Sequence, residues 1–237
     1  MSTGQHHAVR RDPEALASET VEDYAKAIFA LQRRAGGPVG TSAIANRLGL
    51  SPASVTAMLK RMHAMKLVAR EPYRGVTLTP AGEKVALEVM RHHRLLEAYL
   101  TEALGMPWDR VHDEAEVLEH YISEELEERI ATALGDPDRD PHGDPIPDRG
   151  LSLDSEHGIA LAKLEPGASG VFSRVSDSDP RMLRYLAECN IHPGASLRVI
   201  RVQPFGGPVL VDVGGREHAI GGELASKMLV ELEEAGA

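Results

Sequence analysis

Two histidines and two glutamates fall in helical register in the stretch VHDEAEVLEHYI. His112, Glu116, Glu119 and His120 lie at positions i, i+4, i+7 and i+8. On a helix, all four side chains project from one face. Imidazole nitrogens and carboxylate oxygens that share one stripe form a ligand set for a divalent metal ion.

A second group of the same donor types comes one predicted helix earlier, where His93 and Glu97 lie at i and i+4. The alternative to metal binding is structural. A single histidine on a helix is usually structural, and the many acidic neighbours of Glu116 and Glu119 could make these residues part of a solvated face. Two matched groups in register favour metal ligands. His92 has no partner in register and is predicted to be a non-ligand.

Composition limits the possible classes of protein. The 237 residues suffice for one large domain or two to three small ones, and aromatic residues make up only 4%. No apolar run approaches the roughly 18 residues of a membrane span. The polar N-terminus lacks the apolar centre of a signal peptide. Cys189 is the only cysteine, which excludes an internal disulfide framework. We therefore expect a cytoplasmic protein with no membrane partner.

The net charge of −10 argues against nucleic acid, but the distribution of charge does not. Residues 41–80 hold six lysines and arginines against Glu71 alone, whereas acidic residues dominate 95–160. One basic segment on an acidic body is a footprint of nucleic-acid binding.

The elements that position these residues begin with a predicted mobile tail over residues 1–17. A helix is expected from Thr20 as N-cap, with Asp23 in its first turn, to the glycines before Pro38. A short helix capped by Thr41 or Ser42 should follow.

After a glycine-containing turn, Ser51 and Pro52 should begin a second helix that ends near Met65. Short helix, turn and longer helix form a helix-turn-helix. Two short strands around the turn at residues 73–75 would add a wing. An ordinary helical hairpin is the alternative, but the wing and the local positive charge favour DNA binding. The candidate DNA contacts are Thr41, Ser42, Ser51, Pro52, Ser54, Thr56, Lys60, Arg61 and Arg74.

The rest of the chain divides into segments that differ in hydrophobic pattern and composition. A long amphipathic helix is expected over residues 80–104 and the ligand helix over 111–134. Their surplus apolar surface predicts a two-fold dimer. Residues 135–155 are rich in Pro, Gly and Asp, and form either a linker or an irregular structured crossing. Short runs of Val, Ile and Leu then predict a small β-barrel, with one short helix at 181–191.

The order of these motifs resembles the diphtheria toxin repressor / manganese transport regulator family. The resemblance rests on SPASVTAMLKRM, YRGVTLTPAG, MRHHRLLE, VHDEAEVLEH and DPHGDPIP. It is close over residues 18–150 and looser beyond them, where the chain is similar to the family's SH3-like (FeoA-type) domain. It implies a bacterial homodimer that binds palindromic operator DNA when loaded with a divalent metal, as a repressor of metal-uptake genes.

The resemblance also implies a fold class and a domain division. The fold is mainly α with a small β C-terminal domain. A winged helix-turn-helix domain is expected at 1–78, a helical metal-binding and dimerisation domain at 79–150, and the SH3-like barrel at 151–237.

In the iron-responsive branch of the family, the primary metal site uses methionine, cysteine, glutamate and histidine. Here the first two positions correspond to Asp23 and Glu116, while Glu119 and His120 match the last two. The chain therefore resembles the manganese-responsive branch, and hard oxygen donors suit Mn²⁺. Asp23 could instead simply cap its helix. A lysine, Lys26, replaces a further glutamate of two-metal members, so two separated sites are expected.

The second, ancillary site of the family is matched by His93, Glu97 and His112. Asp177 and Asp179 are candidate ligands from the C-terminal domain. An Fe²⁺-dependent repressor is the alternative within the family, and Co²⁺, Zn²⁺ or Cd²⁺ should be able to substitute.

Two further classes compete with a metal-dependent repressor. A di-metal carboxylate enzyme also uses bundled Glu and His ligands. However, Glu119 and His120 are adjacent rather than spaced by three, and no nucleophile motif or phosphate-binding glycine loop accompanies them. We therefore expect no enzymatic activity and no small organic substrate. A metal-independent winged-helix regulator with an organic effector is the third class.

Overall fold

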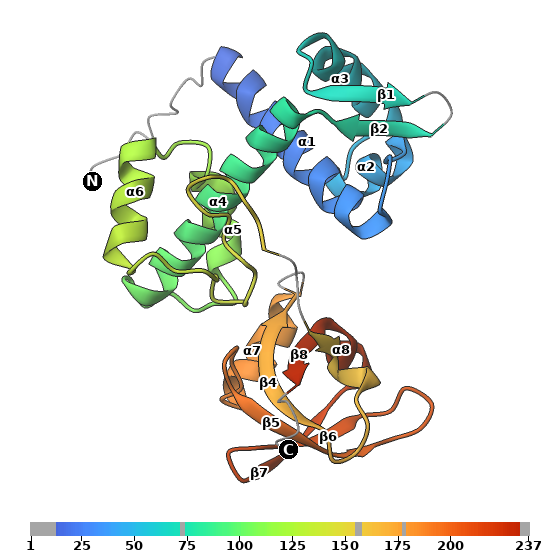
Figure 1. The fold of residues 1–237 in the computed structure, drawn as a ribbon, viewed down its shortest axis with the longest axis vertical. Coiled ribbons are helices and arrows are strands. Elements are labelled where there is room, and N and C mark those ends of the chain that lie inside the picture. Colours follow the sequence, from blue (N-terminus) through green and yellow to red (C-terminus); the bar gives the residue numbers. More distant parts are fainter. Residues whose placement is uncertain (1–12, 72–73, 155–157, 177–178, 233–237) are drawn as a thin grey trace, which may run out of the picture. The chain divides into compact units, whose positions relative to one another are not determined.

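The computed structural model divides into two compact units, residues 1–90 and 91–237. Figure 1 shows the helices and strands of the chain as a ribbon. Helices dominate up to residue 133 and strands dominate after it, which confirms the predicted fold class. Among the residues described, no helix is long and apolar enough to cross a membrane. The structure describes residues 13–71, 74–154, 158–176 and 179–232.

The first unit is a winged helix-turn-helix, as predicted. The β-strands pair antiparallel and form the wing, and Val39 makes an isolated bridge to Val76. Helices and wing enclose one apolar core, which includes Ile28, Ile44 and Met62. The elements are α1 (Pro13–Ala35), α2 (Thr41–Leu48), α3 (Pro52–Ala64), β1 (Val68–Glu71) and β2 (Gly75–Leu78).

Helix α1 begins earlier than expected. Its first residue is Pro13, so Thr20 lies inside the helix, and the prediction that Thr20 is its N-cap is wrong. Proline suits the first helical position, and the following alanine, leucine and glutamate residues favour helix. The predicted mobile tail is therefore wrong for residues 13–17, and its first twelve residues lie outside the described chain. The end of α1 is as predicted: Gly36 follows with φ of 68° and its N–H donates to the Gln32 carbonyl.

The N-cap of α3 is the predicted residue, whereas the N-cap of α2 is not. Gly40 is the N-cap of α2, with no side-chain cap, so the prediction of Thr41 or Ser42 is wrong. Ser51 caps α3 as predicted, because its Oγ accepts a hydrogen bond of 3.1 Å from the Ser54 N–H.

The second unit contains most of α4 (Pro80–Glu102), then α5 (Val111–Leu118) and α6 (Glu124–Ala133). The single ligand helix predicted over 111–134 is therefore wrong. Ser123 starts a new helix, since its Oγ accepts from the Leu126 N–H and acidic residues fill the first turn of α6. Glu119 closes α5, and its N–H donates to the Ala115 carbonyl at 2.9 Å.

The segment after α6 is a structured crossing rather than an open linker. Gly143 has φ of 88°, and a Cβ there would lie 1.9 Å from the Ser173 carbonyl oxygen. Only glycine fits so close an approach of two backbones. The neighbouring His142 carbonyl accepts from the Val175 N–H at 2.9 Å. The crossing is thereby fixed against β4.

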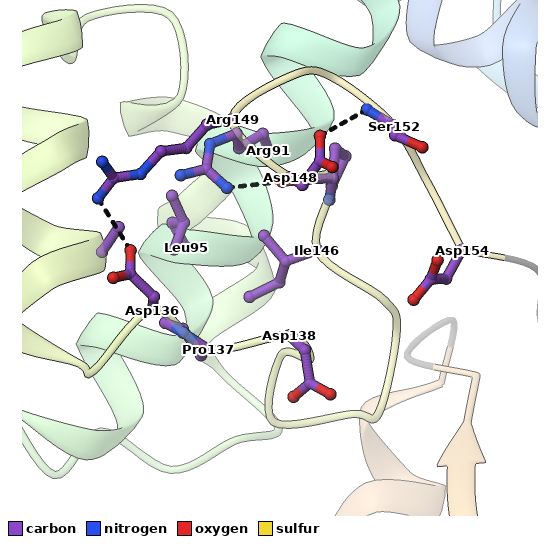
Figure 2. Close-up of a pocket in the computed structure, with 12 residues that line it drawn as sticks. Arg91, Leu95, Asp136, Pro137, Asp138, Ile146, Asp148, Arg149, Ser152 and Asp154 are labelled. Atoms are coloured by element: carbon purple, nitrogen blue, oxygen red, sulfur yellow. Dashed lines mark hydrogen bonds and ion pairs between the residues drawn. The ribbon is translucent and has the colours of Figure 1, made fainter.

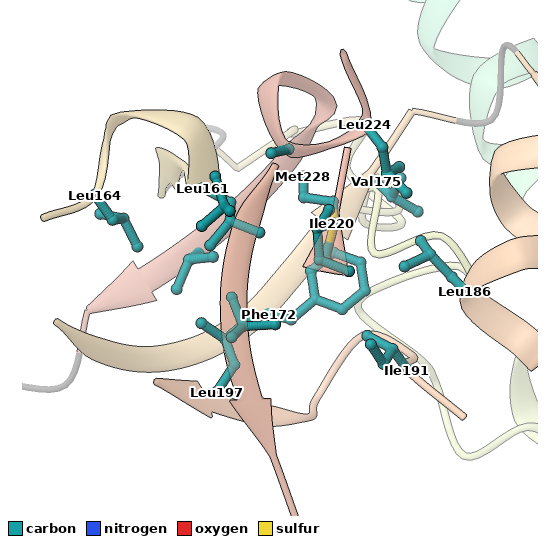
Figure 3. Close-up of a cluster of buried hydrophobic side chains, with 14 of the residues drawn as sticks. Leu161, Leu164, Phe172, Val175, Leu186, Ile191, Leu197, Ile220, Leu224 and Met228 are labelled. Carbon is teal, nitrogen blue, oxygen red and sulfur yellow. The ribbon is translucent and has the colours of Figure 1, made fainter. Parts of the chain in front are cut away.

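The C-terminal part is a six-stranded antiparallel sheet in the order β3-β8-β4-β5-β6-β7. Figure 3 shows its core around Phe172, with Ile220 and Met228 nearby. Trp108, from the segment before α5, belongs to the same core. The elements are β3 (Ile159–Ala160), η1 (Leu161–Lys163), β4 (Ser169–Val175), α7 (Pro180–Glu188), β5 (Ser196–Val202), β6 (Val209–Val213), β7 (Arg216–Ile220), α8 (Gly222–Lys227) and β8 (Met228–Leu232).

Candidate metal centre and nucleic-acid interface

His93 lies at the centre of a buried cluster formed by α4 and α5. Its Nε2 is 3.0 Å from Glu97 Oε1, one helical turn away, and 3.2 Å from His112 Nδ1. His112 Nδ1 is also 3.2 Å from Glu97 Oε1. The structure thus brings the three predicted ancillary ligands together, within 4.8 Å of one another.

The other ring nitrogen of His93 faces residues predicted for the primary site. Nδ1 is 2.5 Å from Glu119 Oε2 and 3.7 Å from Glu116 Oε1. His120 Nε2 lies 3.6 Å from Glu119 Oε1. His93 therefore contacts both predicted ligand sets, so in this unit their side chains form one continuous cluster. Asp23, the remaining predicted primary ligand, is a half-buried residue of α1 in the other unit.

A separate set of contacts fixes the turn that carries Glu119. His92 Nδ1 donates to the Glu119 carbonyl at 3.1 Å, and His92 Nε2 is 3.1 Å from Glu127 Oε2. The Arg91 guanidinium also binds Glu127. These contacts tie α4 to α6 and to the end of α5, so His92 supports the cluster without belonging to it.

Two residues that the sequence analysis missed adjoin Glu97 from the crossing segment. His142 is fully buried, and its Nδ1 is 3.7 Å from Glu97 Oε2. Asp140 Oδ1 accepts hydrogen bonds from the backbone N–H groups of His142 and Asp144, at 2.8 and 3.0 Å. Both residues lie in the DPHGDPIP motif, but helical register cannot reveal ligands on a loop. Glu97, Asp140 and His142 form another group whose donor atoms lie within 4.8 Å of one another.

Charge in this cluster is strongly perturbed. Burial would raise the pKa of Glu97, but the His93, His112 and His142 rings hold that pKa well below its usual range. Burial, Asp144 and Glu97 together raise the pKa of Asp140 well above its usual range. Burial would lower the pKa of His142, yet the Glu97 and Asp140 carboxylates raise it to about 9. The shifts reflect carboxylates and imidazole rings that interact strongly with one another away from water.

The donor set fits a divalent metal ion. The Glu97 and Glu119 side chains are only 1% and 0% exposed. Buried carboxylates require compensating positive charge. Imidazole nitrogens and carboxylate oxygens without sulfur suit the harder first-row cations. The lone cysteine, Cys189, is the C-cap of α7 and does not belong to the cluster.

Asp179, the candidate ligand from the C-terminal domain that the structure describes, does not join these groups. Asp179 caps α7, where its Oδ1 accepts from the Arg181 N–H at 3.0 Å. Its carboxylate also pairs with the Arg181 guanidinium, which lowers the pKa of Asp179 to about 2. Asp177 lies outside the described residues.

A cavity of about 300 Å³ beside the crossing contains none of the predicted ligands (Figure 2). Arg91 donates to the Pro147 carbonyl at 2.6 Å, and Arg149 Nη2 lies 3.0 Å from Asp136 Oδ1. These contacts fix the loop around the cavity.

The predicted DNA contacts lie on the helix-turn-helix and the wing. Ser51 and Ser54 bond to each other through their hydroxyls at 2.9 Å, and the Thr56 hydroxyl donates to the Pro52 carbonyl at 2.8 Å. These hydroxyls keep acceptor capacity while they stabilise the start of α3. Among the predicted contacts, Ser42, Ser51, Pro52, Ser54, Lys60, Arg61 and Arg74 are exposed, and Thr41 and Thr56 are half-buried.

A winged helix-turn-helix and a buried His/Glu cluster in one chain define the class of metal-responsive DNA-binding regulators. The sequence matches the N-terminal DNA-binding domain of iron-dependent repressors over residues 17–76. It matches their metal binding and dimerisation domain over 79–148, and the FeoA domain over 159–232.

Full-length relatives agree with these domain matches. The diphtheria toxin repressor of Corynebacterium efficiens is 33% identical over 223 residues, covering 90% of this chain and 95% of the relative. The iron-dependent repressor IdeR of Mycobacterium tuberculosis is 30% identical over 225 residues, covering 90% and 97%.

Solved structures are similar over the same length. A manganese-dependent transcriptional repressor in complex with manganese has a TM-score of 0.81 and 38% identity, covering 90% of this chain and 100% of that one. The manganese regulator SloR has a TM-score of 0.70 and 29% identity, covering 90% and 98%.

The chain belongs to the diphtheria toxin repressor family. It is a metal-dependent transcriptional repressor and not an enzyme, as predicted. The family binds operator DNA and dimerises through the dimerisation domain.

Proposed function

We propose that this repressor responds to Mn²⁺ and binds a palindromic operator as a dimer when loaded. The observation that carries the proposal is the donor set of the buried cluster, which offers imidazole and carboxylate groups and no sulfur. Sulfur ligands would favour late or softer metals, whereas oxygen-rich sets suit Mn²⁺. The name of the solved manganese-dependent repressor supports the same metal.

The proposal assigns Asp23, Glu116, Glu119 and His120 to the primary ion. His93, Glu97 and His112 would hold the ancillary ion. The cation supplies positive charge that the crowded carboxylates lack. Because Asp23 belongs to the DNA-binding unit, an ion held by both units restricts their relative orientations. Metal then acts by shifting the population toward conformers that match the operator.

At the operator, exposed Lys60 and Arg61 on α3 bind phosphates, and Arg74 on the wing binds the backbone or minor groove. The start of α3 offers serines and threonine rather than arginine, asparagine or glutamine, the side chains best suited to reading bases. Apolar contacts to thymine methyl groups and DNA shape therefore carry much of the specificity. The regulated genes would be those of metal uptake. The repressor would act in the cytoplasm.

An Fe²⁺-dependent repressor is the second candidate, because curated relatives carry the names diphtheria toxin repressor and iron-dependent repressor. The deciding experiment measures operator affinity under anaerobic conditions while Mn²⁺, Fe²⁺, Co²⁺ and Zn²⁺ are titrated. A duplex selected from a randomised library with the Mn²⁺-loaded protein serves as probe. Activation by Fe²⁺ at a lower free concentration, relative to its cellular level, than by Mn²⁺ would exclude the manganese assignment.

A further inference from the structure

Glu97 has two oxygens that face different partners. Oε1 lies against His93 and His112, the proposed ancillary ligands. Oε2 faces away from them toward the crossing segment, 3.7 Å from His142 Nδ1. That distance exceeds a hydrogen bond, and among the described side chains His142 Nδ1 is a buried nitrogen without a hydrogen-bond partner. A fully buried nitrogen directed at a carboxylate without a bond requires an explanation.

The other ring nitrogen of His142 determines which atom carries a proton. Nε2 lies 2.8 Å from the Trp108 carbonyl oxygen, which can only accept, so Nε2 bears the hydrogen. In the neutral ring, Nδ1 then presents a lone pair toward Glu97. A ring fixed in this way by a backbone carbonyl is the usual arrangement of a metal-binding histidine.

The separation of the donors suits a shared cation. With bonds of about 2.1 Å, two ligands of one ion lie about 3.4 Å apart at the tetrahedral angle, and farther apart as that angle opens. The 3.7 Å between His142 Nδ1 and Glu97 Oε2 falls in this range. Asp140 completes the group, since one oxygen atom of each carboxylate and a ring nitrogen lie within 4.8 Å of one another.

The carboxylates of this group have few positively charged partners. Asp144 is paired with two arginines, at 3.4 Å from Arg94 and 2.7 Å from Arg174. Asp140 Oδ2 is 3.8 Å from Arg94 Nε, at the limit of an ion pair, and its side chain is only 2% exposed. Glu97 Oε1 has His93 and His112 beside it, but Glu97 Oε2 and the Asp140 carboxylate share only His142 and the distant Arg94, and a divalent ion between them would balance this charge.

We propose that Glu97, Asp140 and His142 hold a further divalent first-row cation, with Glu97 bridging this ion and the ancillary one. The site would secure the crossing segment to α4 and, through the Trp108 carbonyl, to the segment before α5. The inference rests on the proposed function only through the shared Glu97. Binding requires Asp140 and His142 Nδ1 to be free of protons, so loading releases protons.

The test counts ions in the full-length protein and locates them. The protein is saturated with Mn²⁺, the bound metal per chain is measured by mass spectrometry, and crystals are examined by anomalous diffraction at the manganese edge. We expect an anomalous peak within ligand distance of His142 Nδ1. Two Mn²⁺ ions that share the Glu97 carboxylate should also give an exchange-coupled signal in electron paramagnetic resonance.

Asp140→Asn is the variant of choice. Asparagine Oδ1 can still accept the two backbone hydrogen bonds, but the charge is lost, so this variant should bind one Mn²⁺ fewer per chain and lose the coupled signal. Asp148→Asn is the matched control, because Asp148 Oδ1 accepts from the Ser152 N–H at 2.8 Å in the same loop and lies outside the cluster. The control should retain the wild-type metal content.

The absence of a peak at His142 in Mn²⁺-saturated wild-type crystals would overturn the proposal and leave His142 as an imidazolium paired with the carboxylates. Equal metal content in wild type and Asp140→Asn would overturn it as well. The wild-type diffraction experiment needs no variant to fold. If a peak appears at His142 but operator affinity is the same with and without Mn²⁺, the further metal site would be supported. Only the proposed function would then be contradicted.

Discussion

Replacing two basic residues of α3 should reduce the salt dependence of operator binding by a calculable amount. Lys60 and Arg61 are exposed on the helix that Ser51 caps. Each phosphate contact contributes about 0.9 to the slope of log affinity against log salt. A dimer of the Lys60→Ala, Arg61→Ala variant loses two contacts per chain, so the slope should fall by about 3.6.

Fluorescence anisotropy with the selected duplex and saturating Mn²⁺ measures this slope. Between about 50 and about 200 mM salt, wild type should lose roughly 10²-fold more affinity than the variant. Arg216→Ala, at an exposed position of β7, is the control and should keep the wild-type slope. An unchanged slope in the α3 variant would refute the assignment of these side chains to phosphates.

Three further predictions concern stability. Ser51→Ala removes the cap of α3 and should lower the free energy of unfolding by about 1 kcal/mol in urea titrations; an unchanged midpoint would contradict the capping role. Gly143→Ala forces a Cβ against the Ser173 carbonyl and should cost more than Gly105→Ala, where φ is also positive but the space is open; equal unfolding midpoints would contradict the close approach. In metal-free protein the pKa of His142 is raised to about 9, so its stabilising charge is fully present below about pH 6.5 and is lost as pH rises through 9. The stability difference between wild type and His142→Gln should therefore shrink over that interval, and a constant difference would count against the raised pKa.

The sequence predicted the cluster where helical register governs it. His93 and Glu97 are one turn apart on α4, so their spacing alone placed them on one face, and His112 is the second residue of α5. Glu119 and His120 were predicted to share the face of His112 but to belong to a separate site, whereas Glu119 contacts His93 directly. The closing turn of α5 retains helical geometry for Glu119, so the register survives the break that Ser123 introduces.

Helical register could not predict the residues whose positions depend on tertiary contacts. His142 lies on a loop whose path is set by Gly143 against β4, and no periodicity points from there to Glu97. The start of α1 was missed for another reason: Thr20 is a good cap, but Pro13 and helix-forming residues before it extend the helix past that signal. Gly40 is the N-cap of α2 in place of the predicted Thr41 or Ser42, and glycine is itself one of the residues preferred at this position.

The most direct test of metal control compares operator affinity in Mn²⁺ and in chelator, for wild type and for the Glu116→Ala, His120→Ala variant. Wild type should lose about 5- to 150-fold in affinity on chelation, the range of typical coupling between two ligands. The variant should bind equally weakly in both conditions. Equal affinity of wild type with and without metal, or full Mn²⁺ activation of the variant, would contradict control of DNA binding through this cluster.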